Sequence, residues 1–234
     1  MYTANMTPDE IDRETNADVR NVLAKIEAMS NAFRRKVLKA NKFPVTMRFE
    51  QHSVRKNRWI ISLVAESKKD VNEMMFRDFY CICESPNGKF VYRLLKHPTL
   101  FKYNTIVLKP HFFSRYRERM GLEETGEELI KKVMDRMNYV IEEKYTREDG
   151  GMDYVLSFED GVGLGDVIKD NKVSLVRTFV PKRMLFNDQL PEFQDYEASL
   201  EYVRNEGIEV DELVGERERV LRFMQKNYMR SITQ

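Results

Sequence analysis

Cysteine, glycine and proline are all scarce in this chain of 234 residues, which contains 2 Cys, 10 Gly and 7 Pro. Two cysteines cannot build a disulfide framework, and so little glycine and proline excludes a collagen-like or linker-dominated protein. No stretch approaches the roughly 18 uncharged apolar residues that a membrane helix needs. The first residues, MYTANMTPDEIDRE, are acidic and lack an apolar run, so we expect no secretory signal there. These absences predict a soluble cytoplasmic protein without a membrane role.

The composition is nevertheless that of a folded protein. Hydrophobic residues make up 42% of the chain, which is enough to form a core, and the length suits one large domain with appendages. We predict an α+β fold in which helices pack on an antiparallel sheet, with helical extensions at both ends. The expected division is an N-terminal helical segment (residues 1–43), an α+β core domain (44–182) and a C-terminal helical hairpin (183–234).

Three helices can be placed before the C-terminal region. Apolar residues at steps of three and four predict an amphipathic helix over residues 17–41, and a capping box at Thr7 predicts a short helix before it. A proline at its first position and a glycine after its end mark a helix over residues 110–120. A second capping box, at Thr125, predicts a helix that continues to about Tyr145.

Strand-like runs fill much of the remaining core. Asn87-Gly88 lies between two apolar runs, residues 79–83 and 90–95, which predicts a β-hairpin. Because helices and strands do not alternate along the chain, we expect antiparallel pairing rather than repeated βαβ units. Further strands are predicted at residues 58–64, 105–108, 154–158 and 173–180.

The near-zero net charge of +1 conceals strong segregation of charge along the chain. Residues 34–69 carry eleven Lys or Arg and two acidic residues, and residues 89–119 carry eight and one, whereas residues 121–170 carry six and fourteen. Aromatic residues are interleaved with the basic ones in 89–119, a combination that suits a polyanion with stackable bases. The alternative is a strand-rich core whose outward positions are lysine and arginine.

The sequence KPHFFSRYRERMG, residues 109–121, is the most informative stretch. In a helix, His111, Arg115 and Arg119 share one face, which suits an anion such as phosphate. Phe112 and Tyr116 lie on the adjacent stripe, where they could pack onto the sheet or stack on a base. The alternative for the arginines is a surface helix whose cations pair with nearby glutamates.

A strand is followed by the pattern H-x-x-x-R-x-x-x-R-x-G, by a second helix and by two strands, the second with Arg-Thr near its end. This arrangement resembles the barnase–EndoU–colicin–RelE superfamily of small ribonuclease toxins. The matching positions are His111, Arg115 and Arg119, with Arg177 and Thr178 on the later strand. The resemblance covers about residues 100–182 and implies metal-independent RNA cleavage on an antiparallel sheet. The chain departs from those toxins in its greater length, long N-terminal helix, extra hairpin and helical tail.

The chemistry implied by this resemblance assigns a role to each residue. His111 would serve as general base or acid for attack of the 2′-hydroxyl on phosphorus, while Arg115, Arg119 and Arg177 would stabilise the developing charge. Phe112 or Tyr116 would stack a base, and Thr178 would bond a phosphate oxygen. No metal or cofactor is predicted.

Two further motifs have structural interpretations. The glycine-rich run 161–165 lies between strands and lacks a following helix, so it predicts a turn or bulged hairpin rather than a phosphate-binding loop. Cys81 and Cys83 are two apart in a strand and share a face, which predicts buried structural thiols.

Three functions follow as hypotheses. The first is a nucleic-acid-directed protein, with RNA favoured, that acts as a metal-independent endoribonuclease. The second is a non-catalytic nucleic-acid-binding protein with the same basic surface. The third is a structural protein that forms a homo-oligomer, or binds a protein partner, through its terminal helices. Whether the chain is an enzyme is left open by the sequence.

Overall fold

The structure is a computed structural model of the chain, and it describes residues 1–71, 76–96, 103–137, 140–169, 172–185 and 197–198. The predicted hairpin at residues 183–234 lies almost wholly outside this part. The helices of the described part are α1 (Pro8–Lys39), α2 (Pro110–Met120) and α3 (Gly126–Arg136), with the 3-10 turns η1 (Lys69–Val71) and η2 (Lys182–Met184). Its strands are β1 (Val45–His52), β2 (Arg58–Ala65), β3 (Phe76–Ser85), β4 (Gly88–Lys96), β5 (Tyr103–Leu108), β6 (Ile141–Thr146), β7 (Met152–Phe158), β8 (Gly161–Lys169) and β9 (Val173–Pro181).

These strands form a single sheet in the order β1-β2-β3-β4-β5-β9-β8-β7-β6. Neighbouring strands are antiparallel except β5 and β9, which pair in parallel. The predicted α+β class is therefore confirmed. After β5 the chain enters α2 directly. It then forms α3 and the three strands β6, β7 and β8 before β9 pairs with β5. Helix α2 packs against β9.

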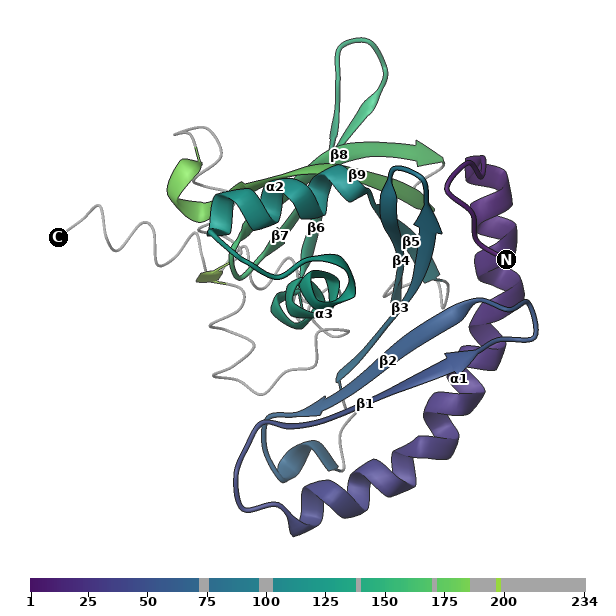
Figure 1. Cartoon of the computed structure of the whole chain (residues 1–234), viewed down its shortest axis with the longest axis vertical. Helices are drawn as coiled ribbons and strands as arrows, with labels where there is room; N and C mark the ends of the chain where they lie inside the picture. The colour runs from purple at the N-terminus through teal and green to yellow at the C-terminus, as the bar shows by residue number, and fades with distance from the viewer. Residues whose placement is uncertain (72–75, 97–102, 138–139, 170–171, 186–196, 199–234) are drawn as a thin grey trace, which may run out of the picture.

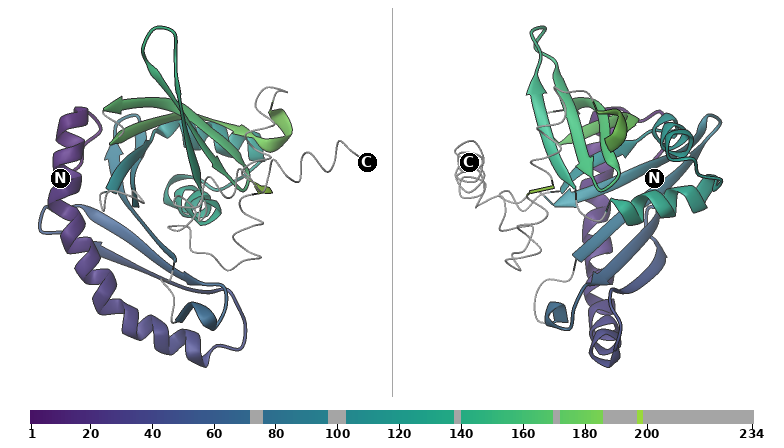
Figure 2. Two further views of the ribbon diagram at one scale, coloured as in Figure 1. Left: turned by 180° about the vertical axis from the view of Figure 1, so that it is seen from behind. Right: turned by 90° about the vertical axis from the view of Figure 1, so that its left-hand side faces the viewer.

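Both faces of the sheet are covered by helices. The sheet curves around α2 and α3, while α1 runs along its outer side (Figures 1 and 2). Because side chains alternate along a strand, neighbouring residues of β2 enter different cores: Trp59 and Ile61 pack with α1, and Ile60 packs with α2 and α3. This double coverage explains why β2 is a nearly continuous apolar run.

α1 is longer than the sequence predicts. It runs without a break from Pro8 to Lys39, so the expected short first helix and the helix over residues 17–41 are one element. The capping box is present, because the Thr7 hydroxyl accepts from the Glu10 amide and the Thr7 amide donates to the Glu10 carboxylate. Its apolar residues are buried against the sheet, so the predicted N-terminal segment shares a core with the strands.

The prediction for the second half of the α3 region is wrong. α3 ends at Arg136, and residues 141–146 form β6, which pairs with β7. The Thr125 side chain makes no capping hydrogen bond. Local sequence favours a longer helix, in which residues 141–146 would form backbone hydrogen bonds within the helix. In the structure these residues form their backbone hydrogen bonds with β7 instead.

The glycine-rich run forms β8, which makes a hairpin with β7 and is bulged against β9 between Leu164 and Gly165. A Cβ at Gly165 would lie 1.7 Å from the Leu175 carbonyl oxygen, so this close approach requires glycine. The bulged-hairpin prediction is confirmed. Cys81 and Cys83 are buried as predicted, and both are free thiols.

Within the described part of the chain, no helix combines the length and apolar character required to cross a lipid bilayer.

Candidate functional site

α2 is anchored on the sheet through its aromatic stripe. Phe112 is fully buried and packs against Phe158 and Phe179, with ring centroids 6.4 and 6.1 Å away. Tyr116 lies 4.6 Å from the Phe179 ring. Pro110 opens the helix, and Gly121 ends it in the left-handed conformation at a φ of 67°, as predicted. The orientation of α2 is thus fixed, and its opposite side faces solvent.

The aromatic stripe packs onto the sheet rather than presenting rings to a base. Phe112 is 0% and Tyr116 2% exposed, so the stacking role predicted for them is wrong in this fold. The Tyr116 hydroxyl donates to Asp160. Burial, together with that hydrogen bond, raises the pKa of Tyr116, so its hydroxyl stays protonated at neutral pH.

His111 and Arg115 are neighbours on the solvent side of α2. The Arg115 Nε donates to His111 Nε2 across 3.4 Å, and an Arg115 Nη lies 2.9 Å from a Glu118 oxygen. The predicted i, i+4 arrangement is therefore present, together with the predicted pairing to a nearby glutamate. Because Arg115 and Glu118 are 40% and 64% exposed, their ion pair contributes at most about 1 kcal/mol.

Arg119 lies at the end of the same flank, next to the end of β9. Its guanidinium donates to the Phe179 carbonyl oxygen, and Arg183 donates to the Arg119 carbonyl oxygen. Each arginine is thus positioned by a neutral acceptor, which leaves its charge without a counter-ion in these contacts. We call the set His111, Arg115, Arg119 and Arg183 the α2 cationic flank. Arg183 was not predicted, because it lies beyond the motif and joins the others only through the path of η2.

Arg177 and Thr178 lie on the other face of the sheet. Thr178 pairs in register with Leu164, which packs in a small apolar cluster away from α2. Arg177 forms an ion pair with Asp166 across 2.8 Å, and Asp166 is in register with Leu175, whose side chain packs on the α1 side. Opposed residues of an antiparallel pair project to the same face.

The sheet therefore separates Arg177 and Thr178 from His111, so the four residues predicted to be catalytic do not converge on one side of the sheet. The physical reason is the bulge at Leu164 and Gly165, which changes the direction of the side chains on β9 at Arg177. The structure brings together His111, Arg115 and Arg119 only.

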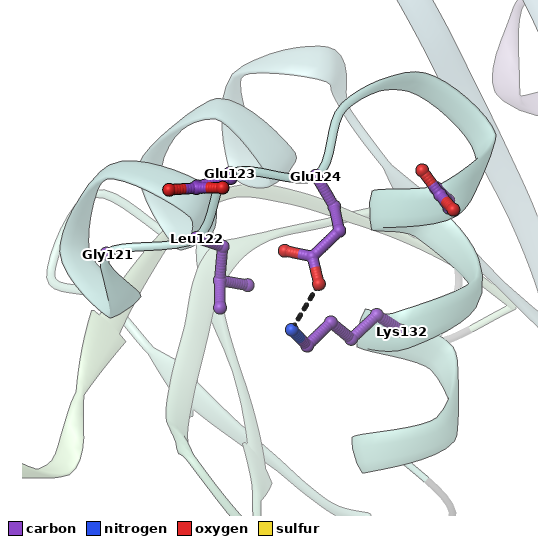
Figure 3. A pocket seen from close by; sticks show the side chains of 6 residues that line it. Gly121, Leu122, Glu123, Glu124 and Lys132 are labelled. Carbon is purple, nitrogen blue, oxygen red and sulfur yellow. Dashed lines mark hydrogen bonds and ion pairs between the residues drawn. The ribbon is translucent and has the colours of Figure 1, made fainter.

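A hollow of about 560 Å³ lies at the far end of α2, in the turn to α3. It is lined by Glu123, Glu124 and Glu128, with Lys132 paired to Glu124 (Figure 3). The hydrogen bond from Lys132 lowers the pKa of Glu124. This acidic lining does not suit a phosphate. Among the described residues, no group of three His, Cys, Asp or Glu side chains is arranged to hold a metal ion.

Comparisons with known proteins give no relative for this chain. No protein-family model, no curated protein and no solved structure matches it. The resemblance to the ribonuclease superfamily therefore stays a prediction that rests on the residues quoted above.

Proposed function

We propose that the protein binds nucleic acid, with RNA as the favoured class, through the α2 cationic flank, and that it acts in the cytoplasm. The observation that carries this proposal is the placement of His111, Arg115 and Arg119 along one exposed side of a rigidly anchored helix, with Arg183 beside them. Arginine suits phosphate because its planar guanidinium donates two parallel hydrogen bonds.

The contacts of the flank support anion binding. Arg119 and Arg183 are held by carbonyl oxygens, which fix the guanidinium groups without neutralising them. The carboxylate bonded to Arg115 is that of Glu118, which is exposed, so a phosphate can displace it at little cost. With Phe112 and Tyr116 buried, binding relies on phosphate contacts and is expected to depend strongly on salt.

Binding without cleavage is favoured over the endoribonuclease. Cleavage by 2′-hydroxyl attack needs a base, an acid and charge stabilisers around one phosphate. His111 has Arg115 beside it, but Arg177 and Thr178 face the other side of the sheet. The oligomer hypothesis is less favoured for α1, whose apolar side is already buried in the core.

Binding is tested by fluorescence anisotropy with a labelled single-stranded RNA of about 20 nucleotides, titrated between about 50 and 200 mM salt. Arg115→Gln/Arg183→Gln should lower the slope of log affinity against log salt by about 1.4, or about 0.7 for each lost phosphate contact on a single strand. The matched control, Arg117→Gln/Lys132→Gln, removes two cations elsewhere on α2 and α3 and should change it little. Equal effects of both variants would reject the α2 cationic flank as the site.

Cleavage is tested separately, with and without EDTA, on the same RNA. If the wild-type protein cuts RNA, His111→Ala should abolish cutting while leaving the melting temperature near that of the wild type, because His111 is exposed. Unchanged cleavage by the His111→Ala protein would reject its catalytic role. Absence of cleavage by the wild type would leave the binding function alone.

A further inference from the structure

Charge is divided sharply along α1. Residues 8–27 contain six acidic and three basic residues, whereas residues 28–49 contain six basic residues and no acidic one. The five basic residues at the C-terminal end of α1 and just beyond it are all exposed; they are Arg34, Arg35, Lys36, Lys39 and Lys42. This stretch is the longest acid-free basic run within the described residues of the helix.

Two of these cations are positioned by contacts that do not neutralise them. The Arg35 Nε donates to the Asn31 carbonyl oxygen at 3.3 Å, and the Lys36 Nζ donates to the Thr46 carbonyl oxygen at 2.7 Å. For Lys39, the described part of the chain provides no ion pair. Carbonyl oxygens restrain these side chains but carry no net charge, so the positive potential of the surface persists.

A second segment adds cations to the same end of the molecule. The turn η1 contacts α1 and lies beside its C-terminal half in each view (Figures 1 and 2). Lys68 and Lys69 of this segment are exposed. The nearby Asp70 accepts from the backbone amides of residues 66 and 67, at 2.6 and 3.0 Å, and so caps the turn. We call Arg34, Arg35, Lys36, Lys39, Lys42, Lys68 and Lys69 the α1 basic surface.

The helix dipole explains only part of this arrangement. Cations are favourable in the last turn of a helix, and the effect falls off beyond that turn. Lys36 and Lys39 lie in the last turn of α1, but Arg34 and Arg35 precede it and Lys42 follows the helix. Lys69 belongs to η1, and Lys68 directly precedes that turn, so neither lysine is part of α1. A ligand of opposite charge accounts for the whole set.

We infer that the α1 basic surface binds the phosphate backbone of a double-stranded nucleic acid. The surface is cationic and contains no aromatic residue, and the large apolar side chain exposed beside it on α1 is Leu38, 51% exposed. Single strands are usually held by aromatic stacking, which is absent here, whereas a duplex exposes only its phosphates and grooves.

An anionic membrane fits this surface less well. A helix that lies in a membrane interface inserts an apolar face between the lipids. The apolar face of α1 is instead packed in the core, where Phe33 and Val37 are fully buried. The inferred surface is separate from the α2 cationic flank, because α1 and α2 lie on opposite faces of the sheet. The inference thus goes beyond the proposed function and does not depend on it.

The test uses the full chain and a labelled RNA duplex of about 20 base pairs, with anisotropy measured between about 50 and 200 mM salt. Arg35→Gln/Lys39→Gln/Lys42→Gln removes three charges from the α1 basic surface. The matched control, Arg13→Gln/Arg20→Gln/Lys25→Gln, removes three exposed charges from residues 8–27 of the same helix. The first variant should lower the salt slope by about 2.7, or about 0.9 for each lost phosphate contact, and weaken binding at low salt at least about tenfold. The control should keep most of the wild-type slope.

Four outcomes decide the matter once circular dichroism has shown that both variants fold. A loss confined to the first variant supports the inference, and equal losses in both variants would overturn it. Binding to anionic vesicles, with no binding to the duplex, would also overturn it in favour of a lipid surface. If Arg115→Gln/Arg183→Gln leaves binding to single-stranded RNA intact while the α1 variant loses the duplex, the proposed function fails and this inference stands.

Discussion

Helices α1 and α2 cover opposite faces of one sheet and present their cations in different ways. On α2 the arginines accompany one acidic residue, Glu118, which is paired with Arg115. From residue 28 to the end of α1 the cations stand in a run without a single acid. Yet both helices are anchored alike, since Phe33 and Phe112 are each fully buried in their own core.

This difference indicates that core packing does not determine which charges these helices carry on their solvent-exposed sides. Two equally buried apolar stripes coexist with different charge patterns on the solvent side, so those patterns need their own explanation. The α2 cationic flank is a short, structured set of arginines fixed against β9. The α1 basic surface is broader, and carbonyl oxygens restrain its Arg35 and Lys36. The first suits a few defined phosphates, and the second suits a repeating backbone.

The largest expected effect tests whether the two helices are anchored equally. Phe112→Ala and Phe33→Ala should each lower the free energy of unfolding by about 3–5 kcal/mol, because each removes a fully buried ring from a packed core. Urea unfolding measures both. The exposed neighbours Ser114→Ala and Arg35→Gln serve as controls and should change stability by less than about 0.5 kcal/mol. A much smaller loss for one phenylalanine would show that its helix is held mainly by other contacts.

A smaller effect concerns the ion pairs that join α3 to strands β2 and β4. Hydrogen bonds from Arg58, and also from Lys89, lower the pKa of Glu127 from 4.5 to about 2. The folded pKa lies below the unfolded one, so this stabilisation is present above about pH 4.5 and is lost as the pH falls towards 2. Glu127→Gln should therefore cost roughly 1–3 kcal/mol at pH 7 and progressively less near pH 3.

The measurement is urea unfolding at both pH values, with Glu128→Gln as the control. Glu128 is exposed at the next position of α3, so its replacement should change stability little at either pH. A cost for Glu127→Gln that is the same at pH 7 and pH 3 would contradict the assigned ion pairs with Arg58 and Lys89.

Much of the fold follows from local sequence, and the failures have identifiable causes. The bounds of α2 were predictable because Pro110 has its φ fixed at a value that suits a helix start, and because Gly121 readily adopts the left-handed conformation that ends a helix. The hairpin at Asn87-Gly88 was predictable because Asn-Gly accepts the positive φ of tight turns and lies between two apolar runs. Strand β6 was not, because residues 141–146 become a strand through pairing with β7, which is a tertiary contact.

The candidate site was predictable only in part. The stripe of His111, Arg115 and Arg119 follows from helical periodicity, which depends on one element alone. The position of Arg177 depends on a bulge between two strands, and no local pattern shows to which face a bulged residue turns. The burial of the aromatic stripe was one of two alternatives, and the choice between them required knowledge of what lies beneath α2.

The smallest expected effect compares the two predicted helix caps. Thr7 caps α1 through a reciprocal pair of hydrogen bonds with Glu10, whereas the Thr125 side chain makes no capping bond to α3. Thr7→Ala should therefore cost about 1 kcal/mol, and Thr125→Ala should cost less than about 0.5 kcal/mol. Thermal or urea unfolding of the two variants measures the difference, and Thr7→Ser, which keeps the hydroxyl, should retain most of the stability. Because both residues occupy N-cap positions in the same protein, equal costs would mean that helix propensity rather than side-chain hydrogen bonding governs these helix starts, and the contrast drawn between them would fail.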